Sequence, residues 1–535
     1  MGGARPHEHP KAYEPGTLAM NVLTSLLGAI IGLELITRVG ITPNTSIIGA
    51  LIAIGIGLIP IGALSAFRNI HRQNLVQTAI SAATFTAANV VLLAIGVPWL
   101  LGYRDLVIPF LIGVIVAAFV DVTTAYWIFD SDVYPASNPW PPGIATAEAI
   151  KAAAERGKRA LLLLYGGIAG AFLRYFGVPA DIIGIAFIAN TWAITMFGIG
   201  LILRGYSIQI FGFDINKLYV PHGIMIGAGI ASLIQLALIV RKASRERREQ
   251  KAAEAEVGGP TVPPELLKKR ILMSYGLFTA GAVVVALACG LYLAMPPAQL
   301  LLWVLYAGFM AIFTTLIVGI SAMHAGWFPA FATALIALVV GLLLGFPPVA
   351  AGLLVGYVAA TGPTFADIAY DLKTGWILRG YGRDVEFELR GRRQQYIAEV
   401  TGIIVGIAMA AAFHQLYFTQ NLFPPVDRVY VATIKAGVDP EIARNLALWS
   451  VVGFIIQLAG GPARQIGILF ATGLLIKYPI AGITTLVAIA VRVALERIYG
   501  VKRVSDVMYV VGAGLIAGSA LTSFFTQTLR ALAKK

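Results

Sequence analysis

Continuous apolar runs, each about 18 to 25 residues long, follow one another along almost the whole chain. A helix needs roughly 20 apolar residues to cross the hydrocarbon core of a bilayer. A membrane β-barrel would instead show alternating polarity in strands of about ten residues. Of the 535 residues, 58% are hydrophobic and only 13% are charged. The pattern predicts an all-α protein that is a polytopic transmembrane helical bundle.

The apolar runs define about sixteen spans, with a range of 14 to 17. They cover residues 18–37, 45–66, 76–101, 106–129, 158–178, 181–203, 219–241, 271–294, 299–320, 325–345, 348–364, 396–416, 443–460, 464–480, 481–498 and 507–529. A polar N-terminal tail over residues 1–17 precedes them and has no signal-peptide pattern.

A Pro/Gly-containing stretch at residues 258–264 lies near the midpoint of the chain. It predicts two structurally related transmembrane halves, 18–250 and 271–530, joined by a cytoplasmic linker at 251–270. A short echo supports this division, because Gly-Ile-Thr-Pro begins at Gly40 and Gly-Trp-Phe-Pro begins at Gly326. Such repeats are common in secondary transporters, which often contain broken or re-entrant helices.

The formal net charge of +13 is concentrated in short loops, as the positive-inside rule predicts, and does not indicate nucleic-acid binding. Residues 241–251 and 373–393 each carry six Lys or Arg, so both are expected to be cytoplasmic. The basic residues at 151–159 also look cytoplasmic, yet three spans separate them from Arg241. One segment between 160 and 241 is therefore predicted to be re-entrant or broken, or a partial crossing lies at 205–218.

The sequence contains no recognisable motif for nucleotide binding, metalloprotease or serine-hydrolase chemistry. It has no GxxxxGK[ST], HExxH or GxSxG pattern, a single cysteine (Cys289), and six histidines that are not clustered. These observations disfavour an enzyme, an ATP-driven pump, a bound cofactor and a His/Cys metal site. A channel or an intramembrane enzyme remains as a less favoured alternative.

Residues 354–379 contain the most unusual intramembrane pattern. An apolar run breaks at Thr361-Gly362-Pro363, and Asp367 and Asp371 then follow at a spacing that places both on one helix face. Ionisable groups inside a bilayer are rare and usually functional. Lys373 begins the basic stretch, so we expect it at the membrane surface with Asp371 as its neighbour, and Asp367 one turn deeper.

Other ionisable residues within spans are candidates for proton or ion coupling, together with Asp367 and Asp371. Asp121 lies 17 positions from the nearest basic residue in sequence, so it must pair with another helix or titrate. Glu34 either faces a cavity or pairs with Arg38 one turn later. His324 lies beside a predicted helix break, and its unperturbed pKa is near physiological pH. Glu399 follows two arginines and is expected to be neutralised near the membrane surface.

Several polar residues are candidates for substrate binding. Glu148 is expected near the start of a small-residue helix, where it could receive a cationic amine or instead pair with Lys151. Hydrogen bonding between helices is the alternative for the polar groups on the spans. The further candidates are Asn74, Gln77, Asn190 and Tyr126.

Three strings together resemble the oligopeptide transporter (OPT) family, in its prokaryotic branch. They are the Asn-x-x-Gln-Thr helix start at 74–78, the Pro-Gly-Ile-Ala-Thr-Ala-Glu loop at 142–148, and Asp-Leu-Lys-Thr-Gly-Trp at 371–376. The chain departs from the family pattern at Glu34, where an uncharged polar residue is usual. It also lacks the Asn-Pro-Gly and Lys-Ile-Pro-Pro-Arg motifs of the eukaryotic peptide-transporting branch, which leaves the substrate open.

The resemblance implies a secondary active transporter that imports oligopeptides or related amino-acid-derived ligands with protons or another cation. A transporter of siderophore-like metal–chelate complexes is the alternative within the same family. The implied location is the cell membrane (inner or plasma), crossed many times, with the lipid bilayer as partner and a homo-oligomer as one possible assembly.

Overall fold

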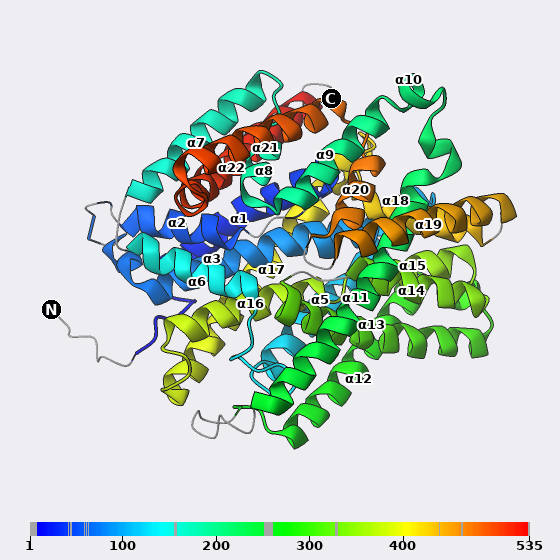
Figure 1. Cartoon of the computed structure of the whole chain (residues 1–535). Coiled ribbons are helices and arrows are strands. Elements are labelled where there is room, and N and C mark those ends of the chain that lie inside the picture. The colour runs from blue at the N-terminus through cyan, green and yellow to red at the C-terminus, as the bar shows by residue number, and fades with distance from the viewer. Residues whose placement is uncertain are drawn as a thin grey trace.

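The computed structural model describes residues 8–532 apart from short gaps, and Figure 1 shows the helices interleaved in one bundle. The gaps are residues 41, 43–44, 58, 60, 63, 155–157, 251–259, 327–329, 438 and 462–463. Most of the two echo motifs and of the predicted linker's first half thus lies outside the described residues. The described part is helical, with one isolated β-bridge between Ser131 and Val262.

The α-helices follow one another with mostly short connections. In chain order they are α1 (Pro15–Arg38), α2 (Ser46–Gly57), α3 (Ile70–Phe85), α4 (Leu93–Leu100), α5 (Val107–Ile128), α6 (Pro141–Ala154), α7 (Lys158–Tyr175), α8 (Ala180–Ile188), α9 (Thr191–Gly205), α10 (Ser207–Phe211), α11 (Val220–Gln250), α12 (Pro264–Ala288), α13 (Pro297–Ala325), α14 (Ala330–Leu343), α15 (Pro348–Ala359), α16 (Pro363–Leu378), α17 (Val385–Phe418), α18 (Pro425–Ala436), α19 (Pro440–Gly460), α20 (Ile466–Leu475), α21 (Pro479–Tyr499) and α22 (Val501–Leu532).

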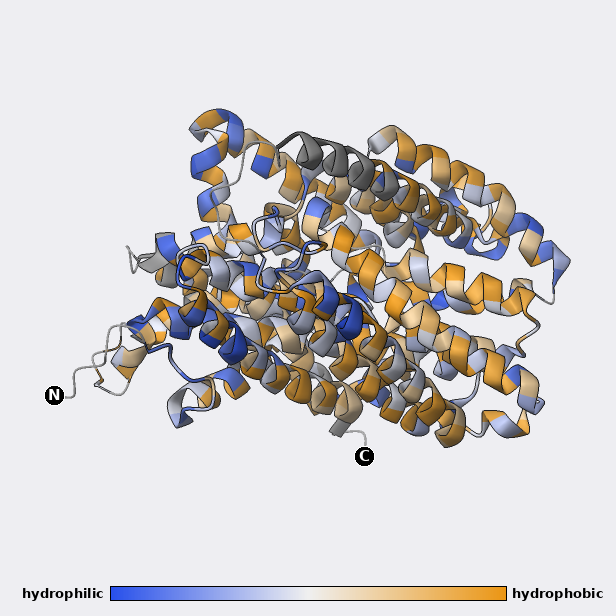
Figure 2. Cartoon of the chain, turned by 90° about the horizontal axis from the view of Figure 1, so that it is seen from below, coloured by the Kyte–Doolittle hydropathy of each residue, from blue (hydrophilic) through white to orange (hydrophobic). Residues whose placement is uncertain are grey.

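Ten helical stretches in the described part are long and apolar enough to cross a bilayer, and six shorter apolar helices accompany them. Figure 2 shows that hydrophobic residues dominate the long helices, while hydrophilic residues gather mostly at helix ends and connections. Composition and length therefore confirm the predicted polytopic helical bundle.

Two spans occupy the centre of the bundle: Ile70–Leu100, which contains α3 and α4, and Pro348–Leu378, which contains α15 and α16. In each, 94% of the most apolar stretch is buried, compared with 17% in Pro440–Gly460. Helix α16 packs against α3, α5 and α17, and α17 also packs along α1 and α3. Polar side chains on these inner helices consequently face protein rather than lipid.

Both central spans are interrupted. The predicted break at Thr361-Gly362-Pro363 is confirmed, because α15 ends at Ala359 and Gly362 adopts a φ of 101° before α16 begins. Glycine is suited to this left-handed backbone, and proline is favoured at the first helical position. In the other span, a π-helical segment at Thr86–Leu92 separates α3 from α4. Such segments are frequent at functional sites.

Three spans predicted to be continuous are shorter or broken. The predicted span 181–203 is wrong as a single helix, because it divides into α8 and α9 at Asn190. The Asn190 side chain accepts hydrogen bonds from the backbone N–H of Trp192 and Ala193, which starts α9. The predicted spans 45–66 and 464–480 contain helices of only 12 and 10 residues, α2 and α20. A broken segment between 160 and 241 agrees with the loop-charge argument.

Helices from the first half of the chain pack against helices from the second half in matching pairs. Helix α22 packs along α7, and α11 packs along α19. Gly40, just after α1, lies against Pro425 at the start of α18, and Gly326, just after α13, lies against Pro141 at the start of α6. These reciprocal contacts are those that two related halves would make, while the division at residues 251–270 stays a prediction.

Candidate functional site

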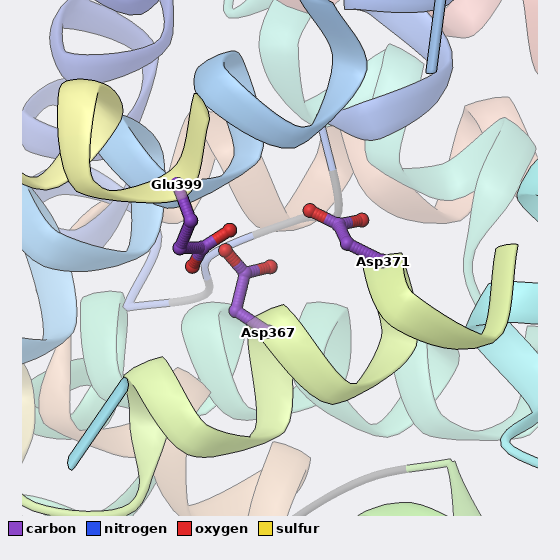
Figure 3. Close-up of side chains that lie close together, drawn as sticks. All are labelled: Asp367, Asp371 and Glu399. Carbon is purple, nitrogen blue, oxygen red and sulfur yellow. The ribbon is translucent and has the colours of Figure 1, made fainter. Parts of the chain in front are cut away.

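Three buried carboxylates meet between α16 and α17. Asp367 and Asp371 extend from α16 and Glu399 extends from α17, and one oxygen from each lies within 4.8 Å of the others (Figure 3). Their relative exposures are 0%, 1% and 0%. We call Asp367, Asp371 and Glu399 the carboxylate cluster.

Local sequence explains how α16 presents its two acids. The spacing of four residues places Asp367 and Asp371 on the same helix face, as predicted from the sequence. The break at Gly362 sets where α16 begins, so the acids lie in its first three turns. Glu399 reaches them because α17 packs against α16.

Few hydrogen-bond donors contact the oxygens of the carboxylate cluster. Ser81 Oγ donates to Asp367 Oδ1 at 2.5 Å, and Ser46 Oγ lies 3.4 Å from Asp371 Oδ1. The side chains of Gln77 and Thr78 lie near Asp371. Among the described residues, Asp367 Oδ2, Asp371 Oδ2 and both Glu399 oxygens have no hydrogen-bond partner.

Basic residues near the cluster bind elsewhere. Arg379 pairs with Glu388 at 2.7 Å, and Arg392 pairs with Glu388 at 3.3 Å. Lys373 Nζ donates to the Ala136 carbonyl at 2.7 Å and lies 4.4 Å from the Trp376 ring centroid. No lysine or arginine in the described part of the chain forms an ion pair with the cluster.

Lys373, which was expected at the membrane surface with Asp371 as its neighbour, therefore does not pair with Asp371. Lys373 is 3% exposed and is bound to the backbone of the 130–140 loop, whereas Asp371 faces Asp367. Asp367 and Asp371 are four residues apart and so lie on one face of α16. Lys373 lies two positions after Asp371 and therefore points to another face.

Glu399 is also placed differently from the sequence expectation. Its helix was expected to begin near residue 396, which would leave the acid near the membrane surface. Helix α17 begins at Val385 instead, because Asp384 caps it by accepting from the backbone N–H of Phe387. Glu399 is thus well inside the helix and fully buried. The N-cap aspartate and the acidic first turn were the sequence signals for the earlier start.

The chemistry of the cluster follows from its burial. Three ionised carboxylates this close together, without basic partners, would carry a large electrostatic cost in a low-dielectric interior. Protons shared among the carboxyl groups would remove that cost, and so would a cation held between the oxygens. The donor set contains only oxygen, which favours hard cations over metals that prefer nitrogen or sulfur ligands.

Asp121 is buried equally deeply but is fully hydrogen-bonded. Its Oδ1 accepts from Thr315, and its Oδ2 accepts from the backbone N–H of Gly362 and Phe365 and from the Thr364 hydroxyl. The four distances lie between 2.6 and 2.9 Å. Of the two alternatives that the sequence left open, the structure shows pairing with other helices: Asp121 binds the N-terminus of α16.

Glu34 pairs with Arg38, as one alternative predicted. Arg38 Nε lies 2.6 Å from Glu34 Oε2, and the Tyr417 hydroxyl donates to Glu34 Oε1 at 2.8 Å. This network joins α1 to α17 and does not include the cluster oxygens. His324 is half-buried in the last turn of α13 and is not one of the cluster residues.

The substrate candidates divide into two groups. Asn74 and Gln77 are buried on α3, and Gln77 Nε2 donates to Asn74 Oδ1 at 2.9 Å beside the cluster. The others lie apart from it. Glu148 is 62% exposed and pairs with Lys151 at 3.2 Å, Asn190 caps α9, and Tyr126 stacks on Tyr396 with 4.6 Å between ring centroids.

Comparison with known protein families gives one match. The model of a family described as OPT oligopeptide transporter protein matches residues 17–241 and 212–529, which together span nearly the whole chain. No curated protein matches significantly. The matched residues include both central spans and all three members of the carboxylate cluster.

Proposed function

Since the chain belongs to the OPT oligopeptide transporter family, we propose that it is a secondary active transporter driven by the proton gradient. The family consists of membrane transporters of oligopeptides or related substrates, and the ten apolar spans agree with that role. The proposed substrates are oligopeptides or related amino-acid-derived ligands, imported across the cell membrane. The proposal extends the family assignment to a coupling ion and to the residues that carry it.

The carboxylate cluster is the observation that supports proton coupling most directly. Four of its oxygens have no partner in the described part of the chain, and they lie on α16 and α17, of which α16 starts at a backbone break. Discontinuous helices of this kind form substrate and ion sites in secondary transporters. We infer that the cluster binds protons when it is closed to water and releases them when α16 and α17 separate.

The polar residues beside the cluster would link protonation to substrate. Gln77 lies near Asp371 and donates a hydrogen bond to Asn74, so a pair of amides on α3 borders the acids. A change in charge at Asp371 would reorient this pair, and a ligand bound against Asn74 would respond. Coupling of this kind requires only that ligand and proton favour the same arrangement of the helices.

The test is uptake of radiolabelled trialanine into proteoliposomes under an imposed pH gradient, with a sodium gradient as the comparison. Accumulation should follow the pH gradient in the natural chain and should be lost in Glu399→Gln, which retains exchange of peptide across the membrane. Glu386→Gln is the matched control, because Glu386 lies on the same helix with a side chain that is 75% exposed.

The outcomes separate the alternatives. Accumulation that follows sodium or a divalent cation, and that still requires Glu399, would assign a metal cation to the cluster instead of protons. Accumulation in Glu399→Gln that equals that of the natural chain would overturn the assignment of coupling to the cluster. Uptake of a siderophore-type chelate with no uptake of peptide would favour the metal–chelate alternative.

A further inference from the structure

The chain segment before the first helix is bound between two inner helices. Residues 8–14, which we call the N-terminal strap, contact the start of α3 and the N-terminal part of α17. Helix α3 carries Ser81, a donor to the carboxylate cluster, and α17 carries Glu399. The strap lies beside Arg379 in the basic stretch 373–393, and therefore on the side expected to be cytoplasmic.

Ala12 is the most deeply buried residue of the strap. Its side chain has no exposed surface and belongs to one apolar cluster with Leu75 of α3 and Ala398 of α17. Ala398 directly precedes the cluster acid of that helix. The backbone N–H of Ala12 donates to Gln394 Oε1 of α17 at 2.9 Å. Separation of α3 from α17 at this level would break the contact.

The two ends of the strap contact the same helices. Glu14 pairs with Arg72 of α3 at 2.6 Å. At the other end, the centroid of the His9 ring lies 5.1 Å from that of His71 on α3. It lies 5.6 Å from the centroid of the Phe387 ring on α17. The strap thus holds α3 and α17 together along its whole length.

His9 makes this contact sensitive to protonation. The side chain is 4% exposed, its Nδ1 lies 2.9 Å from the Pro10 carbonyl, and its Nε2 has no partner among the described residues. Arg379 lies beside it, since a Cβ atom at Gly391 would meet both side chains. Burial, and next the positive charge of Arg379, lower the pKa of His9 from 6.5 to about 3. The imidazole is therefore neutral while the strap is bound.

The other titratable groups around His9 offer no carboxylate to a second proton. Glu388 lies nearby, but its two oxygens already accept from Arg379 and Arg392. His71 is a second imidazole, and its buried Nδ1 also lacks a partner in the described part of the chain. A protonated His9 would thus lie beside Arg379 as an unpaired positive charge, which disfavours the bound strap.

We propose that the N-terminal strap, while bound between α3 and α17, keeps the carboxylate cluster closed to the cytoplasmic side, and that acidification of that side releases it. The inference rests on the proposed function, because it concerns how the proposed transport is regulated. A histidine whose pKa falls on binding stabilises the bound strap at neutral pH, and this contribution is lost as the pH falls below about 6.5. Between pH 7.5 and 5.5, His9 alone should raise the ratio of released to bound strap about tenfold.

The first test measures release through the reaction of a cysteine with a maleimide in detergent, with Cys289→Ala as background. Ala12→Cys should react much more slowly than Tyr13→Cys at pH 7.5, because Ala12 is fully buried and Tyr13 is 55% exposed. The ratio of the two rates removes the effect of pH on the thiol itself. That ratio should rise about tenfold between pH 7.5 and 5.5, and by less than about threefold when His9→Gln is added.

The second test asks whether release of the strap speeds transport. Exchange of radiolabelled trialanine in proteoliposomes without an ion gradient reports how often the transporter opens. Ala12→Glu places a carboxylate in the apolar contact and should raise the exchange rate at pH 7.5 by about threefold or more. Lys11→Glu is the matched control, because the Lys11 side chain is 47% exposed. If Ala12→Glu fails to fold, Gln394→Ala removes the hydrogen bond to Ala12 and should act in the same direction.

The results that would overturn the inference are distinguishable. Equal reaction of the two cysteines at pH 7.5 would mean that the strap is not bound, and a ratio that ignores pH would remove release by acid. An unchanged exchange rate in a folded Ala12→Glu protein would remove the control of opening and leave the proposed function in place. Absence of any peptide exchange by the natural chain would overturn both together.

Discussion

Asp121 and the carboxylate cluster contact the same helix, α16, and are equally buried, yet their surroundings are opposite. Asp121 accepts four hydrogen bonds, including two from the backbone at the start of α16. The three cluster acids leave four oxygens without partners among the described residues. Burial alone therefore does not identify a functional acid. The supply of donors determines whether the charge is stable in place or must be neutralised by a bound proton or cation.

The largest effect should come from Asp121→Ala, which removes all four hydrogen bonds of this carboxylate, three of them at the start of α16. Each hydrogen bond to a charged group contributes roughly 1.5–3 kcal/mol, so the loss should be several kcal/mol and prevent stable folding. Size-exclusion chromatography and thermal unfolding in detergent would measure this loss. Thr315→Val removes one bond only and should fold with a lower unfolding temperature.

A normally folded Asp121→Ala protein that has lost gradient-driven uptake would contradict the distinction between Asp121 and the carboxylate cluster. Asp121 would then be a coupling residue, as the sequence alone allowed, and its hydrogen bonds would not be required for the fold.

Asp367→Asn should impair transport without lowering stability, which is the opposite of the effect expected for Asp121→Ala. Replacing one member of the cluster by a neutral amide removes repulsion between nearby acids, so the unfolding temperature should not fall. Accumulation of peptide against its gradient should be lost, because the cluster can no longer change its charge in the same way. Thermal unfolding and uptake, measured on one preparation, test both statements.

A large fall in the unfolding temperature of Asp367→Asn would contradict this interpretation. It would mean that Asp367 stabilises the fold as Asp121 does, through its 2.5 Å hydrogen bond with Ser81.

The sequence predicts much of this difference but not all of it. The break at Gly362 and the shared face of Asp367 and Asp371 follow from local rules of helix geometry and backbone sterics. The partners of Asp121 lie 194 to 244 residues away, so no local rule could supply them. Glu399 was misplaced because the first three turns of α17 carry two Glu, three Arg and two Gln, and apolar runs do not reveal where such a helix starts.

Tyr417→Phe should have a smaller effect, on stability rather than coupling. The tyrosine hydroxyl donates to Glu34, which also keeps its ion pair with Arg38. Loss of this bond should lower the free energy of unfolding by about 2 kcal/mol. Gradient-driven uptake should remain within a factor of two. Loss of coupling in a stable Tyr417→Phe protein would extend the functional acids to Glu34.

Glu148→Gln should have the smallest effect. The side chain is 62% exposed, and its pair with Lys151 is three residues along the same helix. Exposed pairs of this kind contribute about 0.5 kcal/mol or less. The unfolding temperature, the KM for trialanine and the accumulation ratio should all stay close to those of the natural chain. An increase in KM of tenfold, with folding unchanged, would instead place Glu148 at the amine end of the ligand and move the substrate path towards α6.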